Sequence, residues 1–466
     1  MLLANSTINN QQSKFKLIRK MKIHKRYISA FVALMLSVPV FAQVPAAAPK
    51  QSKPVLLKGA TLHVGNGQVV ENAAVGFDKG KITYAGPQNG ANLSGYDVVD
   101  VTGQHIYPGL IHPNSTLGLN EVESVRATID WREVGDLNPH VRSVIAYNTD
   151  SDIIPTIRTN GVLMTQVTPV GGTISGTSSI VQLDAWNWED AIVKADEGIH
   201  LNWPSMLIST GNSAQDARLA RMREQRESAL AELTTLFRDA AVYKAGKHDN
   251  ENLKLAATAG LFDGSKKLYI HANYGKEIIE SVNFAKQHGV KNIVIVGGRD
   301  AVAVADFLKS NNIAVIYSGV HALPSRAEED VDMPYKTPYL LHKAGVQFAL
   351  DYDLSIHGIR NLPFIAGTAA AYGLDKEQAL ASVSLNAAKI LGIEKQAGSV
   401  EVGKDATLVV SSGDLLDMRT NNVTQAYIQG RKIDLNNKQQ YLYEKFDNKY
   451  KEEKKTPATV TTSAGK

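Results

Sequence analysis

The stretch Tyr107–Leu119, YPGLIHPNSTLGL, is the part of the chain from which the fold is best inferred. A Pro-Gly turn leads into an apolar Leu-Ile pair, which predicts the start of a buried strand. Three polar residues, His112, Asn114 and Thr116, then follow at alternate positions. Because side chains alternate between the two faces of a strand, we expect these three to point into the interior together, with His112 about 7 Å deeper than Asn114. Barrel proteins place functional groups at the polar end of such a strand.

Beyond this stretch, apolar strands alternate with helical patterns. Examples are KLYIHAN, KEIIESVNFAKQHG, NIVIVGG, AVAVADFLKSNN and IAVIYSG, in that order. This alternation predicts a parallel sheet, and its length suits an eight-stranded (β/α)8, TIM-like barrel over residues 109–395.

Both ends of the chain have a different pattern. Residues 54–108 contain short alternating runs, VLLKGATLHV, GQVVENAAVGFD, GKITYAGP and YDVVDVTGQHIYP, which are separated by turn residues. Residues 396–436 return to this pattern with GSVEVGKDATLVVSSGD and VTQAYIQGRKIDL. We predict antiparallel strands in both segments, with the second group completing the sheet begun by the first.

The N-terminus has the pattern of an export signal. The basic run KFKLIRKMKIHKR, Lys14–Arg26, precedes the apolar stretch YISAFVALMLSV and then PVFAQ. That stretch is shorter than the roughly 20 residues of a membrane-spanning helix. We therefore predict a leader over residues 1–42, cleaved after Ala42, and a linker over residues 43–53. The mature chain is expected to lack a transmembrane segment and to be periplasmic or secreted.

Composition excludes several classes of protein. The 50 basic and 46 acidic residues give a net charge of only +4 over 466 residues, without the basic face that nucleic-acid binding needs. There is no cysteine, so disulfides, thiolate catalysis and thiolate metal ligands are excluded. Any metal site must therefore use His, Asp, Glu or modified Lys.

Two further segments belong neither to the predicted barrel strands nor to the antiparallel strands of the chain ends. Residues 212–247 have apolar positions at helical spacing, which predicts a long amphipathic helix packed on the outside of the barrel. A partner-binding helix is the alternative, and the apolar face of such a helix leaves room for a homo-oligomer. Residues 437–466 are rich in Lys, Glu, Thr and Ser and are expected to form a partly disordered tail.

The chain resembles the amidohydrolase superfamily, especially its imidazolonepropionase-like members, from residue 54 to about residue 436. The motifs that carry the resemblance are KGATLHVGNGQVVENAAV, GKITYAGP, YPGLIHPNSTLGL, YIHAN, NLPFIAGTAAAYGLDKEQALASVSLNAAKILGI, GSVEVGKDATLVV and AYIQGRKI. The resemblance implies a metal-dependent (β/α)8 barrel flanked by a small β-sandwich made from both chain ends. It also implies hydrolysis of amide or other C–N bonds in a small molecule, with one or two divalent cations activating water.

The resemblance breaks at the expected metal ligands. Active members follow Pro-Gly-Leu-Ile with Asp-x-His-x-His, which here places His112 at the Asp position, Asn114 at the first His and Thr116 at the second. Both imidazoles are therefore missing, and the metal site is expected to be degenerate. His112 is either a substitute ligand or a polar group of the core.

Later strands show the same loss. His271 in YIHAN corresponds to the family's ligand on the fifth strand, but Gly297 and Gly298 stand where the second histidine usually falls. The segment VTPVGGTISGTSSIVQL contains neither the bridging lysine nor the bridging glutamate.

The last strand, VQFALDYD, carries two aspartates. The resemblance places the catalytic aspartate, which is also a metal ligand, at Asp353, with Asp351 on the same face. Such a carboxylate would take a proton from the attacking water and return it to the leaving amine. The alternative is that one or both carboxylates cap the following turn near Ser355 and His357.

Three hypotheses follow. The first is a hydrolase with one divalent metal, Zn, Fe or Mn, held chiefly by His271 and Asp353, with His112 or Asp351 as an additional ligand. The second is a barrel without metal that serves as a binding protein or as the partner subunit of an active relative. The third is metal-free acid-base chemistry by Asp351 and Asp353 with His271. The sequence does not identify the small-molecule substrate or ligand.

Overall fold

The computed structural model describes residues 46–92, 94–206, 213–246, 250–324, 326–352 and 356–455. These residues contain two eight-stranded sheets, each in one continuous order of strands apart from one additional pairing. The predicted leader and Asp353 both lie outside the described residues.

The first sheet, which we call the chain-end sheet, has the order β16-β15-β14-β5-β1-β2-β3, with β4 paired to β1. Its strands are β1 (Val55–His63), β2 (Val69–Asp78), β3 (Lys81–Pro87), β4 (Asp97–Asp100), β5 (His105–Pro108), β14 (Leu408–Ser411), β15 (Val423–Ile428) and β16 (Arg431–Lys432).

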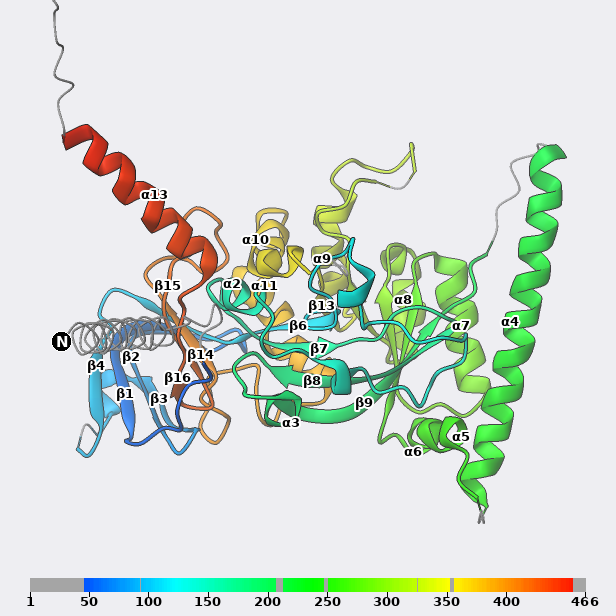
Figure 1. Ribbon diagram of the computed structural model, residues 1–466, viewed down its shortest axis with the longest axis horizontal. Helices are drawn as coiled ribbons and strands as arrows, with labels where there is room; N and C mark the ends of the chain where they lie inside the picture. Colours follow the sequence, from blue (N-terminus) through cyan, green and yellow to red (C-terminus); the bar gives the residue numbers. More distant parts are fainter. Residues whose placement is uncertain are drawn as a thin grey trace, which may run out of the picture. The chain divides into compact units, whose positions relative to one another are not determined.

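Early and late parts of the chain meet in this sheet, as the colours of Figure 1 show. Strand β14 pairs antiparallel with β5, so that Leu408 lies opposite Pro108 and Val410 opposite Ile106. The sheet has a hydrophobic cluster of its own, to which both ends of the chain contribute. Its expected arrangement as a sandwich remains a prediction.

The second sheet is the barrel, with the order β13-β12-β11-β10-β9-β8-β7-β6. Its strands are β6 (Leu110–Ser115), β7 (Val162–Val167), β8 (Ile174–Gln182), β9 (Ile192–Asn202), β10 (Lys267–Ala272), β11 (Ile293–Gly297), β12 (Ala314–Tyr317) and β13 (Phe348–Leu350).

One strand of the barrel departs from the predicted parallel sheet. Strand β8 runs antiparallel to both β7 and β9, whereas all other neighbours are parallel. Residues 168–173 join β7 to β8 directly, and residues 183–191 join β8 to β9 with only the short helix α3 (Trp188–Ala191) between them. A parallel neighbour needs a crossover of a dozen or more residues, so these short connections reverse the chain.

Side chains connect the two terminal strands of the barrel sheet. His112 Nε2 on β6 lies 2.9 Å from Oδ1 of Asp351, the residue that follows β13. Asn114 Nδ2 donates a hydrogen bond to Asp351 Oδ2 at 2.9 Å. The sheet therefore nearly closes, and the prediction of an eight-stranded TIM-like barrel is confirmed.

Helices follow most of the barrel strands. They are α2 (Ile154–Arg158), α4 (Ser213–Ala245), α5 (Leu253–Thr258), α6 (Gly260–Asp263), α7 (Gly275–Gln287), α8 (Ala305–Ser310), α9 (Met333–Ala344), α10 (Leu362–Ala371), α11 (Lys376–Ser382) and α12 (Leu385–Leu391).

The long helix predicted between residues 212 and 247 is α4, whose bounds confirm the prediction. Leu233, Phe237 and Ala240 are buried and bring the second half of the helix against the rest of the chain. Val242, an apolar residue in the last turn of the helix, is 69% exposed. The apolar face therefore ends before the last turn of the helix.

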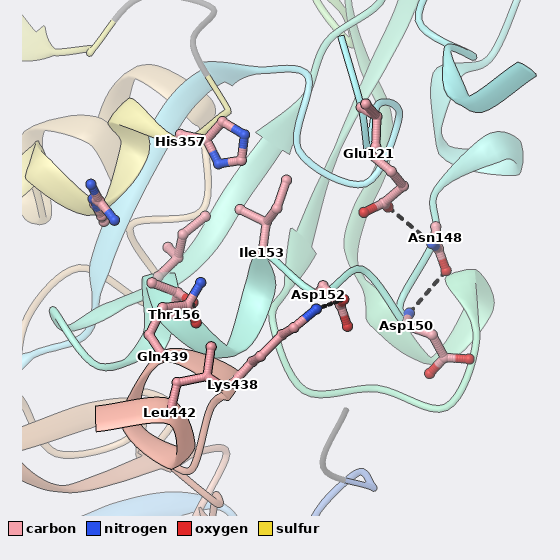
Figure 2. Close-up of a pocket in the computed structure, with 13 residues that line it drawn as sticks. Glu121, Asn148, Asp150, Asp152, Ile153, Thr156, His357, Lys438, Gln439 and Leu442 are labelled. Carbon is pink, nitrogen blue, oxygen red and sulfur yellow. Dashed lines mark hydrogen bonds and ion pairs between the residues drawn. The ribbon is translucent and has the colours of Figure 1, made fainter. Parts of the chain in front are cut away.

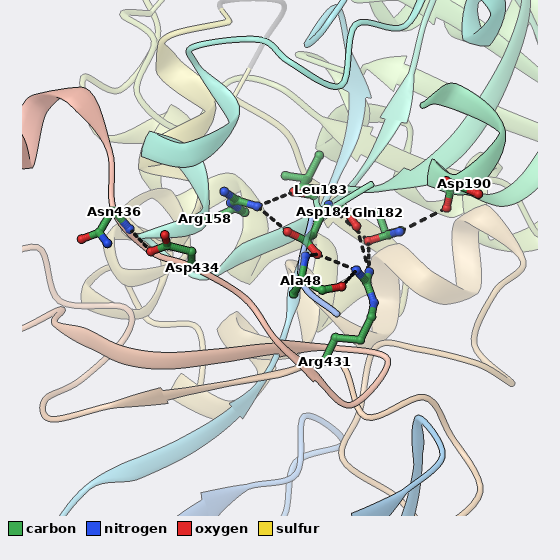
Figure 3. A network of polar contacts seen from close by, with 9 residues as sticks. All are labelled: Ala48, Arg158, Gln182, Leu183, Asp184, Asp190, Arg431, Asp434 and Asn436. Carbon is green, nitrogen blue, oxygen red and sulfur yellow. Dashed lines mark hydrogen bonds and ion pairs between the residues drawn. The ribbon is translucent and has the colours of Figure 1, made fainter. Parts of the chain in front are cut away.

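A buried ionic cluster joins the chain-end sheet to the barrel (Figure 3). Asp184, just after β8, receives Arg158 Nη1 at 2.9 Å and Arg431 Nη1 of β16 at 2.5 Å. The backbone N–H of Ala48 donates to the same carboxylate at 2.9 Å. Three distant parts of the chain are thus held by one aspartate.

Part of the predicted tail, Lys438–Lys455, forms helix α13, and the part after Lys455 lies outside the described residues. Lys, Glu and Gln are good helix formers, and ion pairs such as Lys451–Asp447, 2.6 Å apart at i,i+4 spacing, add to helix stability. The helix exposes several aromatic side chains, Tyr443 among them. Among the described residues, no helix is long and apolar enough to cross a membrane.

Candidate active site

The site begins at a bulge in β6. Asn114 adopts a φ of +60°, a left-handed conformation that asparagine tolerates better than most residues. His112 pairs with Thr165 while Ser115 pairs with Val167, so β6 has one extra residue between these points. This bulge breaks the alternation from which we predicted that Thr116 points in the same direction as His112. Thr116 is buried, but the sequence periodicity no longer fixes its direction.

Asp351 is the carboxylate around which the polar residues of β6 gather. It is 1% exposed and accepts hydrogen bonds at Oδ2 from Asn114 Nδ2 (2.9 Å) and Ser318 Oγ (2.7 Å). His112 Nε2 lies close to Oδ1 but accepts from the backbone N–H of Tyr352 at 3.3 Å. Oδ1 itself has no aligned hydrogen bond among the described residues.

These contacts favour one of the two interpretations of Asp351. Among the described residues, its hydrogen-bond partners are Asn114 and Ser318 and none belongs to the turn near His357. Asp353, the residue we predicted to be catalytic, lies outside the described residues and stays a prediction. The carboxylate that the structure places at the end of the last strand is Asp351.

A cavity of about 210 Å³ lies where β12 and β13 end. It is lined by Ser318, Val320, His321, Ala322, Asp351, Tyr352 and Ile365. His321 Nε2 lies 2.9 Å from Thr368 Oγ1, and its ring meets that of Tyr352 edge-on at 5.9 Å. Functional groups of barrel enzymes lie at this end of the strands, so Asp351 and this cavity are the candidate site.

Sequence analysis missed a second polar cluster, centred on Glu197 of β9. Glu197 is 1% exposed and accepts from Gln166 Nε2 (2.5 Å) and Ser178 Oγ (2.9 Å) at Oε1 and from Tyr269 OH (2.8 Å) at Oε2. Burial raises the pKa of its carboxyl, although nearby Lys267 and these hydrogen bonds oppose the shift. The sequence signal was a charged residue, Glu197, within the segment IVKADEGIHLN. The other polar residues of this segment obscure the period-two pattern by which a strand is recognised.

His271 lies on β10 as predicted, but its neighbour is another histidine. His200 Nδ1 is 2.9 Å from His271 Nε2, and the ring of His200 stacks on Tyr269 with centroids 4.8 Å apart. Burial lowers the pKa of His271 to about 4, with Asp351 opposing the shift, and lowers the pKa of His200 well below its ordinary value. Both imidazoles are therefore neutral at pH 7.

The residues present do not fit a metal centre of the usual kind. A catalytic zinc commonly has three protein ligands, and the described residues contain no group of three or more His, Asp or Glu that could hold a metal ion. His271 shares a short contact with His200, while hydrogen bonds already occupy both oxygens of Glu197. The predicted set of His271, Asp353 and His112 stays a prediction because Asp353 is not described.

A separate cavity of about 510 Å³ lies beside the first turn of α13 (Figure 2). Glu121, on its wall, accepts hydrogen bonds from Asn148 Nδ2 (3.0 Å) and Ser151 Oγ (2.8 Å). Lys438 of α13 lies 3.8 Å from Asp152. These contacts satisfy the polar groups locally, and none of the predicted site residues lines this cavity.

Comparisons with known proteins agree with the fold. A sequence model of the amidohydrolase family matches residues 175–433. The chain is 24% identical to an imidazolonepropionase of Bacillus velezensis over 372 residues, covering 74% of this chain and 84% of the relative. It is 23% identical to a 5-methylthioadenosine/S-adenosylhomocysteine deaminase of Symbiobacterium thermophilum over 411 residues, covering 80% and 88% respectively. The crystal structure of an amidohydrolase from Thermotoga maritima has a TM-score of 0.72 and 25% identity, covering 82% of this chain and 99% of that one.

Proposed function

Because the chain belongs to the amidohydrolase family, we propose that it hydrolyses a C–N bond of a small amide, cyclic amide or amino-substituted ring. The observation that carries this proposal is the position of Asp351. It is a buried carboxylate at the end of the last barrel strand, on the wall of a cavity, with one oxygen lacking an aligned hydrogen bond among the described residues. The relatives named imidazolonepropionase and deaminase support the choice of bond.

Asp351 supplies the proton transfers in this proposal. Its carboxylate takes a proton from water as the water oxygen bonds to the substrate carbon, and returns that proton to the nitrogen as the C–N bond breaks. Ser318 and Asn114 hold Oδ2 through hydrogen bonds, and His112 Nε2 lies 2.9 Å from Oδ1, so that three side chains fix the carboxylate at the wall of the cavity. We route no step through a metal, because the described donor groups do not fit one.

A second function is favoured by the hydrogen bonding inside the barrel. Glu197, His200 and His271 have partners within the protein, as expected of a barrel whose interior has become a stable polar core. In this alternative the chain binds a small molecule, or pairs with an active relative, without turnover.

The test is hydrolysis of a panel containing simple amides, an imidazolone, 5-methylthioadenosine and S-adenosylhomocysteine, with Asp351→Asn as the decisive variant. We expect Asp351→Asn to lower kcat by about 10²- to 10⁴-fold, the usual contribution of general acid-base catalysis. The matched control is Asp239→Asn, which removes an exposed carboxylate of α4 and should leave turnover unchanged.

Two results would contradict the hydrolase proposal. One is turnover that survives Asp351→Asn at the level of Asp239→Asn. The other is no turnover of any panel member together with tight binding of one of them, which would favour the binding protein. Elemental analysis of the same full-length protein tests the reduced metal set, since about one equivalent of zinc, iron or manganese would require ligands beyond those described.

A further inference from the structure

A chain of hydrogen bonds extends from His271 into the barrel interior. Ser178 Oγ donates to Glu197 Oε1 at 2.9 Å, His200 Nε2 lies 2.9 Å from Ser178 Oγ, and His200 Nδ1 lies 2.9 Å from His271 Nε2. Glu197, Ser178 and His200 are at most 1% exposed, whereas His271 is partly exposed. The reaction proposed above uses none of the three buried residues.

Gln166 fixes the direction of the protons at the buried end of this chain. Its Oε1 accepts the backbone N–H of Asn114 at 3.0 Å, so its amide nitrogen is the atom that faces Glu197 Oε1 at 2.5 Å. An ionised carboxylate accepts hydrogen bonds at both oxygens and donates none. Ser178 Oγ therefore donates to Glu197 Oε1 at 2.9 Å, a shorter contact than the 3.3 Å to the backbone oxygen of Gly198.

The remaining protons follow one by one. Since the hydroxyl proton of Ser178 points to Glu197, Ser178 Oγ accepts a hydrogen bond from the N–H of His200 Nε2. A neutral imidazole carries one N–H, so His200 Nδ1 must accept from His271 Nε2. His271, neutral as well, is left with Nδ1 as its acceptor atom.

We propose that Glu197, Ser178 and His200 are positioning residues that hold His271 in the Nε2–H tautomer, with the Nδ1 lone pair available to a water or a substrate N–H. His200 contacts the Nε2 atom of His271 and leaves Nδ1 on another edge of the ring, and the residue is partly exposed. The catalytic consequence rests on the proposed function, but the tautomer does not. A failure of hydrolysis and a failure of this inference are therefore distinguishable.

The test is ¹⁵N NMR of the full-length protein with labelled histidine, in which the correlation pattern of each ring identifies the protonated nitrogen. The chain has 12 histidines, so His271→Gln and His200→Gln assign the two signals. We expect His271 to carry its proton on Nε2 in the unmodified protein. Ser178→Ala removes the acceptor of His200 Nε2 and should shift both rings toward Nδ1–H.

The matched control is Ser179→Ala, the adjacent buried serine, whose Oγ accepts the backbone N–H of Asp196 outside the chain of bonds. It should leave both tautomers unchanged. If Ser178→Ala does not fold, Glu197→Gln, which keeps the size of the side chain, replaces it. An Nδ1–H tautomer of His271 in the unmodified protein, or equal tautomer populations in the Ser178 and Ser179 variants, would overturn the inference.

Kinetics provide a second readout on any substrate that the panel identifies. Removal of the hydrogen-bond partners that orient metal-binding histidines typically costs about 10- to 100-fold, and we take this range for a partner that orients His271. We expect Ser178→Ala to lower kcat by this factor with KM unchanged, and Ser179→Ala to behave as the unmodified protein. A rise in KM alone would contradict a role in orienting His271.

Discussion

Replacing Asp184 by Asn should destabilise the protein far more than replacing an exposed aspartate. The side chains of Asp184 and Arg158 are 1% and 3% exposed, and that of Arg431 is 13% exposed. The variant keeps the size of the side chain but leaves the guanidinium of Arg158 buried without its counter-charge. Breaking a buried ion pair from one side typically costs about 3–5 kcal/mol.

The structure supports the middle of this range rather than its lower end. Hydrogen bonds to a charged group contribute roughly 1.5–3 kcal/mol each, and the carboxylate accepts from Arg158, Arg431 and the backbone N–H of Ala48. These contributions share one group and do not add, so we expect about 4 kcal/mol rather than their sum.

The measurement is urea unfolding of full-length protein, followed by tryptophan fluorescence and circular dichroism. The control Asp239→Asn removes an exposed ion pair with Arg238, for which a loss of about 0–1 kcal/mol is expected. Equal losses in the two variants would show that the Asp184 cluster does not join the chain-end sheet to the barrel energetically. A loss confined to one of two separate unfolding transitions would refute the role of Asp184 as a shared link.

Two other predictions follow from the structure and the sequence. Burial lowers the pKa of His271 to about 4, so between about pH 6.5 and pH 4 the unfolded chain binds a proton that the folded chain does not. The free energy of unfolding should therefore decrease as the pH is lowered through this window. In urea unfolding from about pH 7 to pH 4.5, His271→Gln should make the free energy of unfolding less dependent on pH, and an unchanged dependence would contradict the shift. We also propose that exported protein begins at Gln43, which intact-mass measurement would show; a retained leader would refute the predicted cleavage after Ala42.

The barrel was predictable because its later strands have simple patterns. The runs KLYIHAN, NIVIVGG, IAVIYSG and VQFALDYD became β10 to β13, where apolar residues alternate between the interior and the helices. Strand β8 was not predictable as antiparallel, because its direction depends on short connections rather than on its own residues. The bulge at Asn114 was likewise hidden, since a single positive φ leaves no mark on sequence periodicity.

The candidate site was predictable only in part. Periodicity places Asp351 and Asp353 on the same face, so only contacts with Asn114 and Ser318 distinguish Asp351. Glu197 and His200 were missed because β9 mixes charged and apolar residues without a clear period. Their importance comes from partners on β7, β8 and β10, which no local pattern reveals.

The polar residues of the barrel interior, among them Asn114, which the resemblance places at a ligand position, have a common physical effect. Asn114 gives its amide hydrogen to Asp351, a carboxylate that would otherwise require a cation in a buried site. Glu197 receives hydrogen bonds from Gln166, Ser178 and Tyr269. His200 and His271 form a hydrogen bond with each other. A cation entering this interior would have to displace several of these bonds before gaining its own ligands. The polar interior is therefore stable as a hydrogen-bonded network, and any chemistry there depends on how that network directs the protons of Asp351 and His271.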